Sequence, residues 1–160
     1  MAKKKEEKTN VMRVLEQKNI PYTAHTYPAD GPVDGVSVAG YLGQDVEQVF
    51  KTLVARGEKT GIHVFCIPVC CELDLKKAAK AAGDKNMELV PVKELLNLTG
   101  YIRGGCSPVG MKKKYPTFFD ETCELYEEIA VSAGERGHQM LVPPMDLARY
   151  VGAKLVDITD

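Results

Sequence analysis

The sequence contains no tryptophan, no long apolar run and no excess of charge of one sign. Its longest apolar stretch, Ile62–Cys71, includes a histidine and a proline and is far shorter than the roughly 20 residues of a membrane-spanning helix. The basic residues at the N-terminus are not followed by the apolar segment of a secretory signal. We therefore expect a cytoplasmic protein that does not enter a membrane.

Charge and cysteine usage argue against two further classes of protein: those that bind a nucleic acid through their overall charge, and those that contain disulfides or a metal site. Lys and Arg number 21 and Asp and Glu 22, so the net charge of −1 gives no general attraction for a polyanion. A nucleic acid would need a local basic patch or help from a second protein. The five cysteines form no CxxC pair and the three histidines have no ligand spacing, which predicts reduced thiols, no metal site and no cofactor.

A chain of 160 residues with 44% hydrophobic residues has the size and composition of a single compact domain. We expect residues 1–8 to form a flexible basic N-terminus and residues 9–160 to form that domain. The oligomeric state stays open.

Helix and strand patterns alternate irregularly along the domain. Apolar spacing predicts a helix over Asn10–Asn19, and turn-forming residues predict a loop over Pro28–Gly35. Val49–Ala55 and Ile62–Pro68 are expected to pair as an antiparallel hairpin. The other expected elements are helices near 38–42, 75–82, 91–96 and 143–150, and strands at 117–120, 129–132, 139–142 and 154–158. The mixture predicts an α+β fold with a mixed sheet or partial barrel and helices packed outside it.

The functional candidates are a lysine within a strand and segments rich in small or basic residues. Lys51 has apolar neighbours, so it is either an edge-strand residue that reaches water or an ammonium group that binds an anion or carbonyl in a cleft. Gly100–Gly110 is either a backbone cradle for an oxyanion or a long connection, and it lacks the ending of a nucleotide-binding P-loop. Val131–Gly137 is either a second pocket wall or a turn. Lys112–Lys114 either contacts phosphate or is solvated.

The chain contains, in order, the segments His25–Tyr27, Val49–Leu53, Leu73–Ala79, Thr99–Gly110 and Val131–Gly137. Together these five segments resemble the YbaK family of aminoacyl-tRNA deacylases, which is related to the editing domain of bacterial prolyl-tRNA synthetases. The resemblance runs from about Asn10 to Ile158 and favours the pocket interpretation of Lys51.

The resemblance implies a mixed α/β fold in which a curved, barrel-like sheet and helices surround a small pocket. It implies catalytic roles for Lys51, Gly104 and Gly105. The positions that match substrate-binding residues of the family are Tyr27, Thr52, Ser132, Ala133 and Gly134. Two positions depart from the family pattern. Gln139 stands where some members carry an acidic residue, and Cys106 stands where members have an aliphatic residue, so no catalytic role is carried over to Cys106.

The implied function is trans-editing, the removal of cysteine from mischarged Cys-tRNA(Pro), with Cys-tRNA(Cys) as a second candidate substrate. In the family the substrate thiol attacks its own ester, so the enzyme needs no nucleophile. It has to position the substrate and to stabilise the oxyanion, which backbone N–H donors near Gly104 and Gly105 would do. Prolyl-tRNA synthetase is the expected partner. Two alternatives stay open: a deacylase of another mischarged tRNA, such as Ala-tRNA(Pro), that activates water, and a module that binds a synthetase or tRNA without catalysis.

Overall fold

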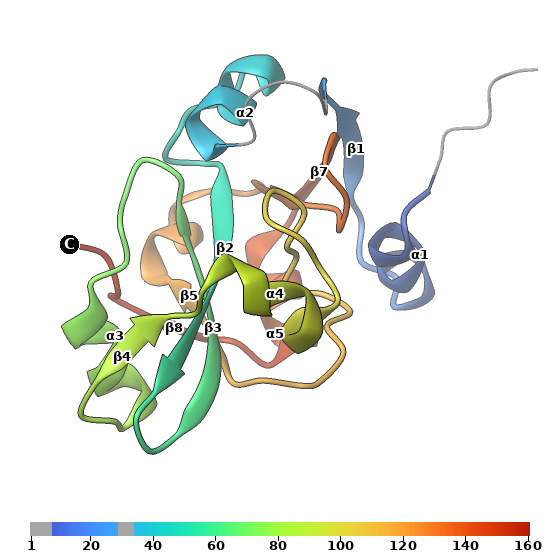
Figure 1. Ribbon diagram of the computed structural model, residues 1–160. Coiled ribbons are helices and arrows are strands. Elements are labelled where there is room, and N and C mark those ends of the chain that lie inside the picture. The colour runs from blue at the N-terminus through green and yellow to red at the C-terminus, as the bar shows by residue number, and fades with distance from the viewer. Residues whose placement is uncertain (1–7, 29–33) are drawn as a thin grey trace, which may run out of the picture.

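The computed structural model describes residues 8–28 and 34–160, in which five α-helices and one 3₁₀ helix surround two β-sheets (Figure 1). Residues 1–7 of the predicted tail and 29–33 of the predicted loop lie outside the described part of the chain. The helices are α1 (Asn10–Gln17), α2 (Gly35–Leu42), α3 (Leu75–Ala82), α4 (Val92–Thr99), η1 (Glu121–Leu125) and α5 (Pro144–Val151). The strands are β1 (Thr23–Thr26), β2 (Phe50–Gly57), β3 (Gly61–Pro68), β4 (Met87–Leu89), β5 (Thr117–Asp120), β6 (Ile129–Ser132), β7 (His138–Val142) and β8 (Lys154–Val156).

The strands form a mixed five-stranded sheet, in the order β4-β2-β3-β5-β8, and an antiparallel three-stranded sheet, β1-β7-β6. In the larger sheet β3 pairs in parallel with β5, and β5 in parallel with β8. The two sheets meet at a single parallel bridge between Val49 and Ala130. The predicted α+β class is confirmed, but two sheets replace the single curved sheet, and the described residues form no closed barrel.

Local sequence signals account for most helix ends. The Asp74 carboxylate accepts hydrogen bonds from the backbone N–H groups of Lys76 and Lys77, both at 3.0 Å, and so caps the start of α3. Gly83 ends the same helix with a φ of +71°, a left-handed conformation that glycine adopts without strain. The predicted hairpin is also confirmed, since β2 and β3 pair from Phe50 with Pro68 down to Gly57 with Gly61.

Two apolar clusters hold the layers together. α1 and α5 pack their buried residues, among them Leu15 and Leu147, onto the three-stranded sheet and the neighbouring face of β2 and β5. α3 covers the other face of the large sheet, where Phe65 and Phe118 stack with ring centroids 5.4 Å apart. None of the described helices has the length and apolarity needed to cross a bilayer.

The first half of β2 has an open edge. β4 pairs with Ala55–Gly57, and no strand among the described residues continues this pairing toward Lys51. The backbone N–H of Val69 donates to the carbonyl of Val49 at 2.8 Å, so Val49, Lys51 and Leu53 turn their backbone groups toward β3. The backbone groups of Thr52 therefore point to the open edge.

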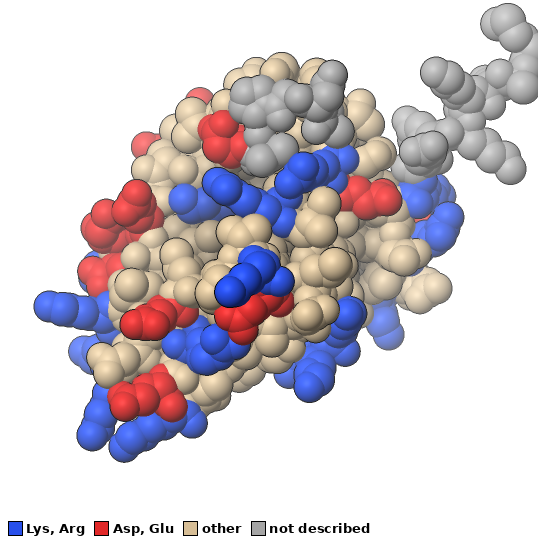
Figure 2. Space-filling model, viewed as in Figure 1, with Lys and Arg blue, Asp and Glu red and all other residues tan. Residues whose placement is uncertain are grey.

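Charges of both signs are interspersed on the face of the molecule shown in Figure 2. This matches the net charge of −1 and leaves no broad basic field on that face.

Candidate active site

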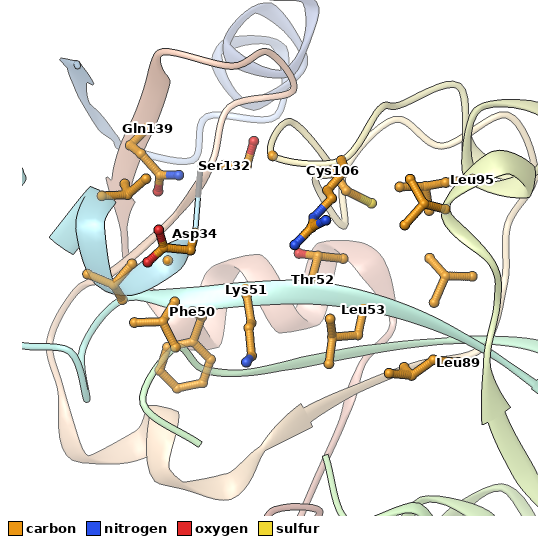
Figure 3. A pocket seen from close by; sticks show the side chains of 18 of the residues that line it. Asp34, Phe50, Lys51, Thr52, Leu53, Leu89, Leu95, Cys106, Ser132 and Gln139 are labelled. Carbon is orange, nitrogen blue, oxygen red and sulfur yellow. The ribbon is translucent and has the colours of Figure 1, made fainter. Parts of the chain in front are cut away.

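A hollow of about 410 Å³ lies against the open edge of β2. Its walls come from β2, the start of α2, β6, β7, the segment from β4 to α4, and the glycine-rich loop that follows α4. Polar and apolar side chains both line it. In Figure 3, Gln139 and Asp34 lie toward one end, and Leu53, Leu89 and Leu95 lie toward the other. Such a hollow can hold a small molecule with one polar and one apolar part.

Five of the eight predicted site residues line this hollow, although they are far apart in the sequence. These are Tyr27, Lys51, Thr52, Gly104 and Ser132. The other three, Gly105, Ala133 and Gly134, are not among the lining residues. The structure therefore brings the five YbaK-like positions together and gives the remaining three a place behind the wall.

Lys51 lies at the rim of the hollow, and none of the described residues forms an ion pair or hydrogen bond with its amine. Its side chain extends from β2 to the side away from Ser132, Gln139 and Cys106 (Figure 3). The sequence-based picture of an amine that faces the glycine-rich loop thus differs from the conformation seen. Strand alternation explains the difference, because Lys51 and Thr52 leave β2 on opposite faces. The four-carbon stem can still turn the amine toward a ligand at the open edge.

The glycine-rich loop turns sharply where it reaches the hollow. Gly104 has a φ of +86° and lines the hollow, so backbone rather than a side chain forms this part of the wall. The N–H of Gly105 donates to the carbonyl of Ile102 at 3.0 Å and closes the turn. The Gly105 N–H therefore already has an acceptor within its own loop. Among the described residues the N–H of Gly104 has no such partner.

Gly105 lies where two loops touch backbone to backbone. A Cβ at this position would lie 3.2 Å from the backbone nitrogen of Arg136 and 3.3 Å from the carbonyl carbon of Glu135. The Nε of Arg136 also donates to the carbonyl of Arg103 at 2.8 Å, which ties the same two loops together. Gly105 thus positions the wall by its lack of a side chain.

We expect Gly105→Ala to lower the stability of the protein by about 1–3 kcal/mol, because the two backbones must move apart by a few tenths of an ångström. The deacylase activity that the family resemblance implies should fall with it, since Gly104 moves as well. Thermal unfolding and a deacylation assay measure the two effects. The control is Gly40→Ala in α2, where the new Cβ would have no neighbour within 4 Å. Equal behaviour of the two variants would contradict the close approach of the loops.

In the wall that faces the glycine-rich loop, the backbone N–H groups of Ala133 and Gly134 already donate hydrogen bonds within the protein. The N–H of Gly134 donates to Oγ of Ser132 at 3.1 Å, and the N–H of Ala133 donates to the carbonyl of His138 at 3.0 Å. Ala133 is fully buried in the core, and a Cβ on Gly134 would lie 2.9 Å from a methyl carbon of Val11. Ala133 and Gly134 therefore support Ser132, which lines the hollow.

Two buried polar atoms in the hollow lack partners. Among residues 8–28 and 34–160, Oη of Tyr27 and Oε1 of Gln139 have no hydrogen-bond partner, although these residues are only 7% and 6% exposed. A buried polar atom without a partner costs about 1–3 kcal/mol. Unpartnered polar atoms of this kind in a hollow point to a ligand that supplies the missing partners.

Cys106 lines the hollow but is unsuited to be a nucleophile. Burial raises the pKa of its thiol to about 12, so the thiol is neutral at physiological pH. The described residues also contain no group of three His, Cys, Asp or Glu side chains that could hold a metal ion. Cys106 is therefore not a thiolate nucleophile for the hollow.

The charged groups that line the hollow in the described part of the chain are two cations and one carboxylate. Lys51 and Arg103 are the cations. Asp34 caps α2, and its pKa is lowered by hydrogen bonds from the backbone N–H and the hydroxyl of Ser37. Asp34 is therefore ionised at neutral pH and already engaged, which leaves the two cations available to an anionic ligand.

Several lining residues were not assigned from the sequence. They include Asp34, Arg103 and an apolar wall formed by Leu53, Leu89, Val92 and Leu95. The capping pattern ahead of α2 marks Asp34 as a helix start, but nothing local indicates that it reaches a hollow. The apolar wall depends on the pairing of the three-residue strand β4, which no sequence pattern predicted.

Both the sequence and the fold match known proteins. A family model for the aminoacyl-tRNA editing domain matches residues 33–150, so the chain belongs to this family. The chain is also 46% identical over 161 residues to EbsC of Enterococcus faecalis, which is named for an inferred Cys-tRNA(Pro)/Cys-tRNA(Cys) deacylase activity. That alignment covers 99% of this chain and 98% of EbsC.

Solved structures agree with this assignment. A crystal structure described as an inferred trans-editing enzyme for prolyl-tRNA synthetase is 28% identical, with a TM-score of 0.81 over 94% of this chain and 96% of that one. The hypothetical protein APE2540 shares the fold, with 20% identity and a TM-score of 0.85 over 94% of this chain and 99% of that chain. These similarities confirm the predicted fold class, the predicted family and the assignment to the aminoacyl-tRNA deacylases.

Proposed function

We propose that this protein removes cysteine from mischarged Cys-tRNA(Pro) in the hollow beside β2. The observation that carries the proposal is a pair of buried polar atoms, Tyr27 Oη and Gln139 Oε1, that lack a partner among the described residues, in a hollow that Lys51 and Arg103 also line. The identity to EbsC supports cysteine as the amino acid. A separate editing site is needed because a small difference between two amino-acid side chains changes the free energy of binding to an apolar synthetase pocket by only about 1–3 kcal/mol. That difference is too small to reject the wrong amino acid firmly.

The substrate supplies the nucleophile in this proposal. Its thiolate attacks the ester carbonyl, so a C–S bond forms while the C–O bond to the ribose breaks. The ribose oxygen leaves with a proton, and the amino acid departs as a cyclic thiolactone. A free thiol is already a few per cent ionised at neutral pH, so correct positioning supplies much of the rate enhancement.

Two backbone donors are suited to stabilise the negative charge that develops on the carbonyl oxygen. The N–H of Gly104 lies in the wall of the hollow, and the N–H of Thr52 points to the open edge of β2. Lys51 and Arg103 would bind the phosphate or ribose of the terminal adenosine. Gly105, by contrast, is not proposed to contact the substrate. Its lack of a side chain lets the glycine-rich loop lie close to the facing loop.

We further propose that prolyl-tRNA synthetase presents the tRNA in a ternary complex. The net charge of −1 and the mixed charges on the surface in Figure 2 support weak binding of tRNA by this chain alone. Cytoplasmic location follows from the same role in translation.

A deacylation time course tests the function. We expect rapid release of cysteine from Cys-tRNA(Pro), little release of alanine from Ala-tRNA(Pro), and none of proline from Pro-tRNA(Pro). Added prolyl-tRNA synthetase should lower the KM for Cys-tRNA(Pro). Faster hydrolysis of Ala-tRNA(Pro) would establish the water-activating alternative, and binding without turnover would establish the non-catalytic one. Nanomolar binding of tRNA by the isolated protein at physiological salt would contradict the ternary complex.

A further inference from the structure

A second hollow, of about 380 Å³, lies on the far part of the glycine-rich loop and is lined by three lysines. Lys18 comes from the end of α1, and Lys113 and Lys114 come from the segment that precedes β5. Its other walls include Tyr115, Tyr150 of α5 and the stretch Pro108–Met111. We call this site the lysine hollow. Figure 1 shows α1 and the loop after α4 on the same side of the molecule.

The lysine hollow has no acidic partner within the described part of the chain. None of its lining residues is Asp or Glu, and Lys18, Lys113 and Lys114 take part in none of the ion pairs there. Like charges around one concavity repel each other, and no ion pair among residues 8–28 and 34–160 offsets that repulsion for these three lysines. Their arrangement is therefore suited to an anion with several negative charges.

The loop links the lysine hollow to the candidate active site. Gly104 and Cys106 line the active-site hollow, and Pro108 and Val109 line the lysine hollow a few residues further on. An extended chain spans at most about 3.6 Å per residue, so Cys106 and Pro108 are within ~7 Å of each other at their Cα atoms. A hydrogen bond from the hydroxyl of Tyr101 to the carbonyl of Val109 fixes the loop between the two hollows.

We propose that the lysine hollow binds backbone phosphates of the RNA whose aminoacylated end occupies the active-site hollow. This inference rests on the proposed function, because it takes a tRNA as the substrate. Lysine binds phosphate as a compact point charge, without base specificity, so the lysine hollow would position the RNA strand rather than read its sequence. It also gives a chain with a net charge of −1 the local basic patch that a nucleic acid requires.

The test compares Lys18→Gln/Lys113→Gln/Lys114→Gln with a matched control, Lys76→Gln/Lys80→Gln/Lys85→Gln. The control removes the same charge from exposed lysines on and just after α3, on the opposite side of the molecule in Figure 1. We expect the lysine-hollow variant to raise the KM for Cys-tRNA(Pro) about tenfold or more. The slope of log Kd for uncharged tRNA against the logarithm of the salt concentration should fall by about 2–3, because each lost phosphate contact lowers this slope by ~0.7–0.9. The control should change neither quantity.

A small substrate separates this inference from the proposed function. Cysteinyl-adenosine ester lacks the phosphate backbone, so the lysine-hollow variant should hydrolyse it at the wild-type rate. Unchanged KM and an unchanged salt slope for tRNA would overturn the role of the lysine hollow while leaving the deacylase activity intact. If no version of the protein hydrolyses either substrate, the proposed function fails, and the salt slope with uncharged tRNA still decides whether RNA binds there.

Two further outcomes would also overturn the inference. Binding of inorganic phosphate that is lost in the variant, with tRNA binding unchanged, would show a site for free phosphate. A defect seen only in the presence of prolyl-tRNA synthetase would show a surface that contacts protein. Should the triple variant unfold, Lys113→Gln/Lys114→Gln serves instead, because both side chains are exposed and their loss should leave the thermal unfolding midpoint unchanged.

Discussion

Lys51→Ala is expected to lower kcat/KM for Cys-tRNA(Pro) by about 10–100-fold, because a lost hydrogen bond to a charged phosphate costs about 1.5–3 kcal/mol. The amine has no ion pair or hydrogen bond among the described residues, so it is free to turn toward a substrate at the open edge of β2. For the same reason its removal should leave the fold intact. Deacylation kinetics and the thermal unfolding midpoint measure the two effects separately.

Two control variants make this result interpretable. Lys51→Arg keeps the positive charge and should retain part of the activity if the amine binds a phosphate. Lys59→Ala removes an exposed lysine from the turn at the far end of the same hairpin and should behave as wild type. A kcat/KM of Lys51→Ala within threefold of the wild-type value would show that Lys51 takes no part in binding or catalysis.

The parts of the fold that depend on local rules were predictable from the sequence. Asp74 and Gly83 mark the two ends of α3, and the predicted turn Arg56–Gly61 contains the observed one, which is shorter because the pairing of β2 and β3 continues to Gly57 and Gly61. Each of these features is decided by neighbours in the chain, through a capping hydrogen bond or a turn conformation. The segment His25–Tyr27 of the family resemblance overlaps strand β1, which local pattern alone did not indicate.

The parts that depend on distant partners were not predictable in this way. β4 has three residues and exists because it pairs with Ala55–Gly57, and the gap that it leaves along β2 creates the hollow. The division into two sheets likewise depends on how β6 meets β2 at Val49. The use of the Gly105 N–H by Ile102 is a further such case, because the glycine pattern predicts a flexible backbone but not which N–H groups stay free.

Gln139 and Cys106 show how departures from a family pattern can be informative. Both line the hollow, which their sequence positions alone did not establish. Cys106 is a buried neutral thiol, in keeping with the aliphatic residue found there in the family. Gln139 presents an unpartnered carbonyl oxygen, which can accept a hydrogen bond from a substrate donor such as an α-ammonium group without adding a charge.

Replacing the substrate's thiol by a hydroxyl should slow hydrolysis by at least about 10²-fold, because a serine hydroxyl is a far weaker nucleophile than a thiol that is a few per cent ionised at neutral pH. The hollow supplies no replacement, since burial raises the pKa of Cys106 to about 12. Parallel assays of Cys-tRNA(Pro) and Ser-tRNA(Pro) measure the ratio. Equal rates would show that the protein activates water.

The pH dependence of the same reaction gives an independent measurement of the attacking group. A substrate thiol with a pKa of about 8.5 becomes more ionised as the pH rises, so the rate should increase about tenfold from pH 6 to pH 7 and level off near the pKa. Rates without the protein must be subtracted at each pH, because the ester also hydrolyses spontaneously. Mass spectrometry should detect a cysteine amide when a low concentration of an amine is present, because the amine opens the thiolactone, forms the amide bond and releases the thiol. A rate that is constant over this pH range, with free cysteine as the first product, would contradict attack by the substrate thiol and transfer the nucleophilic role to water held in the hollow.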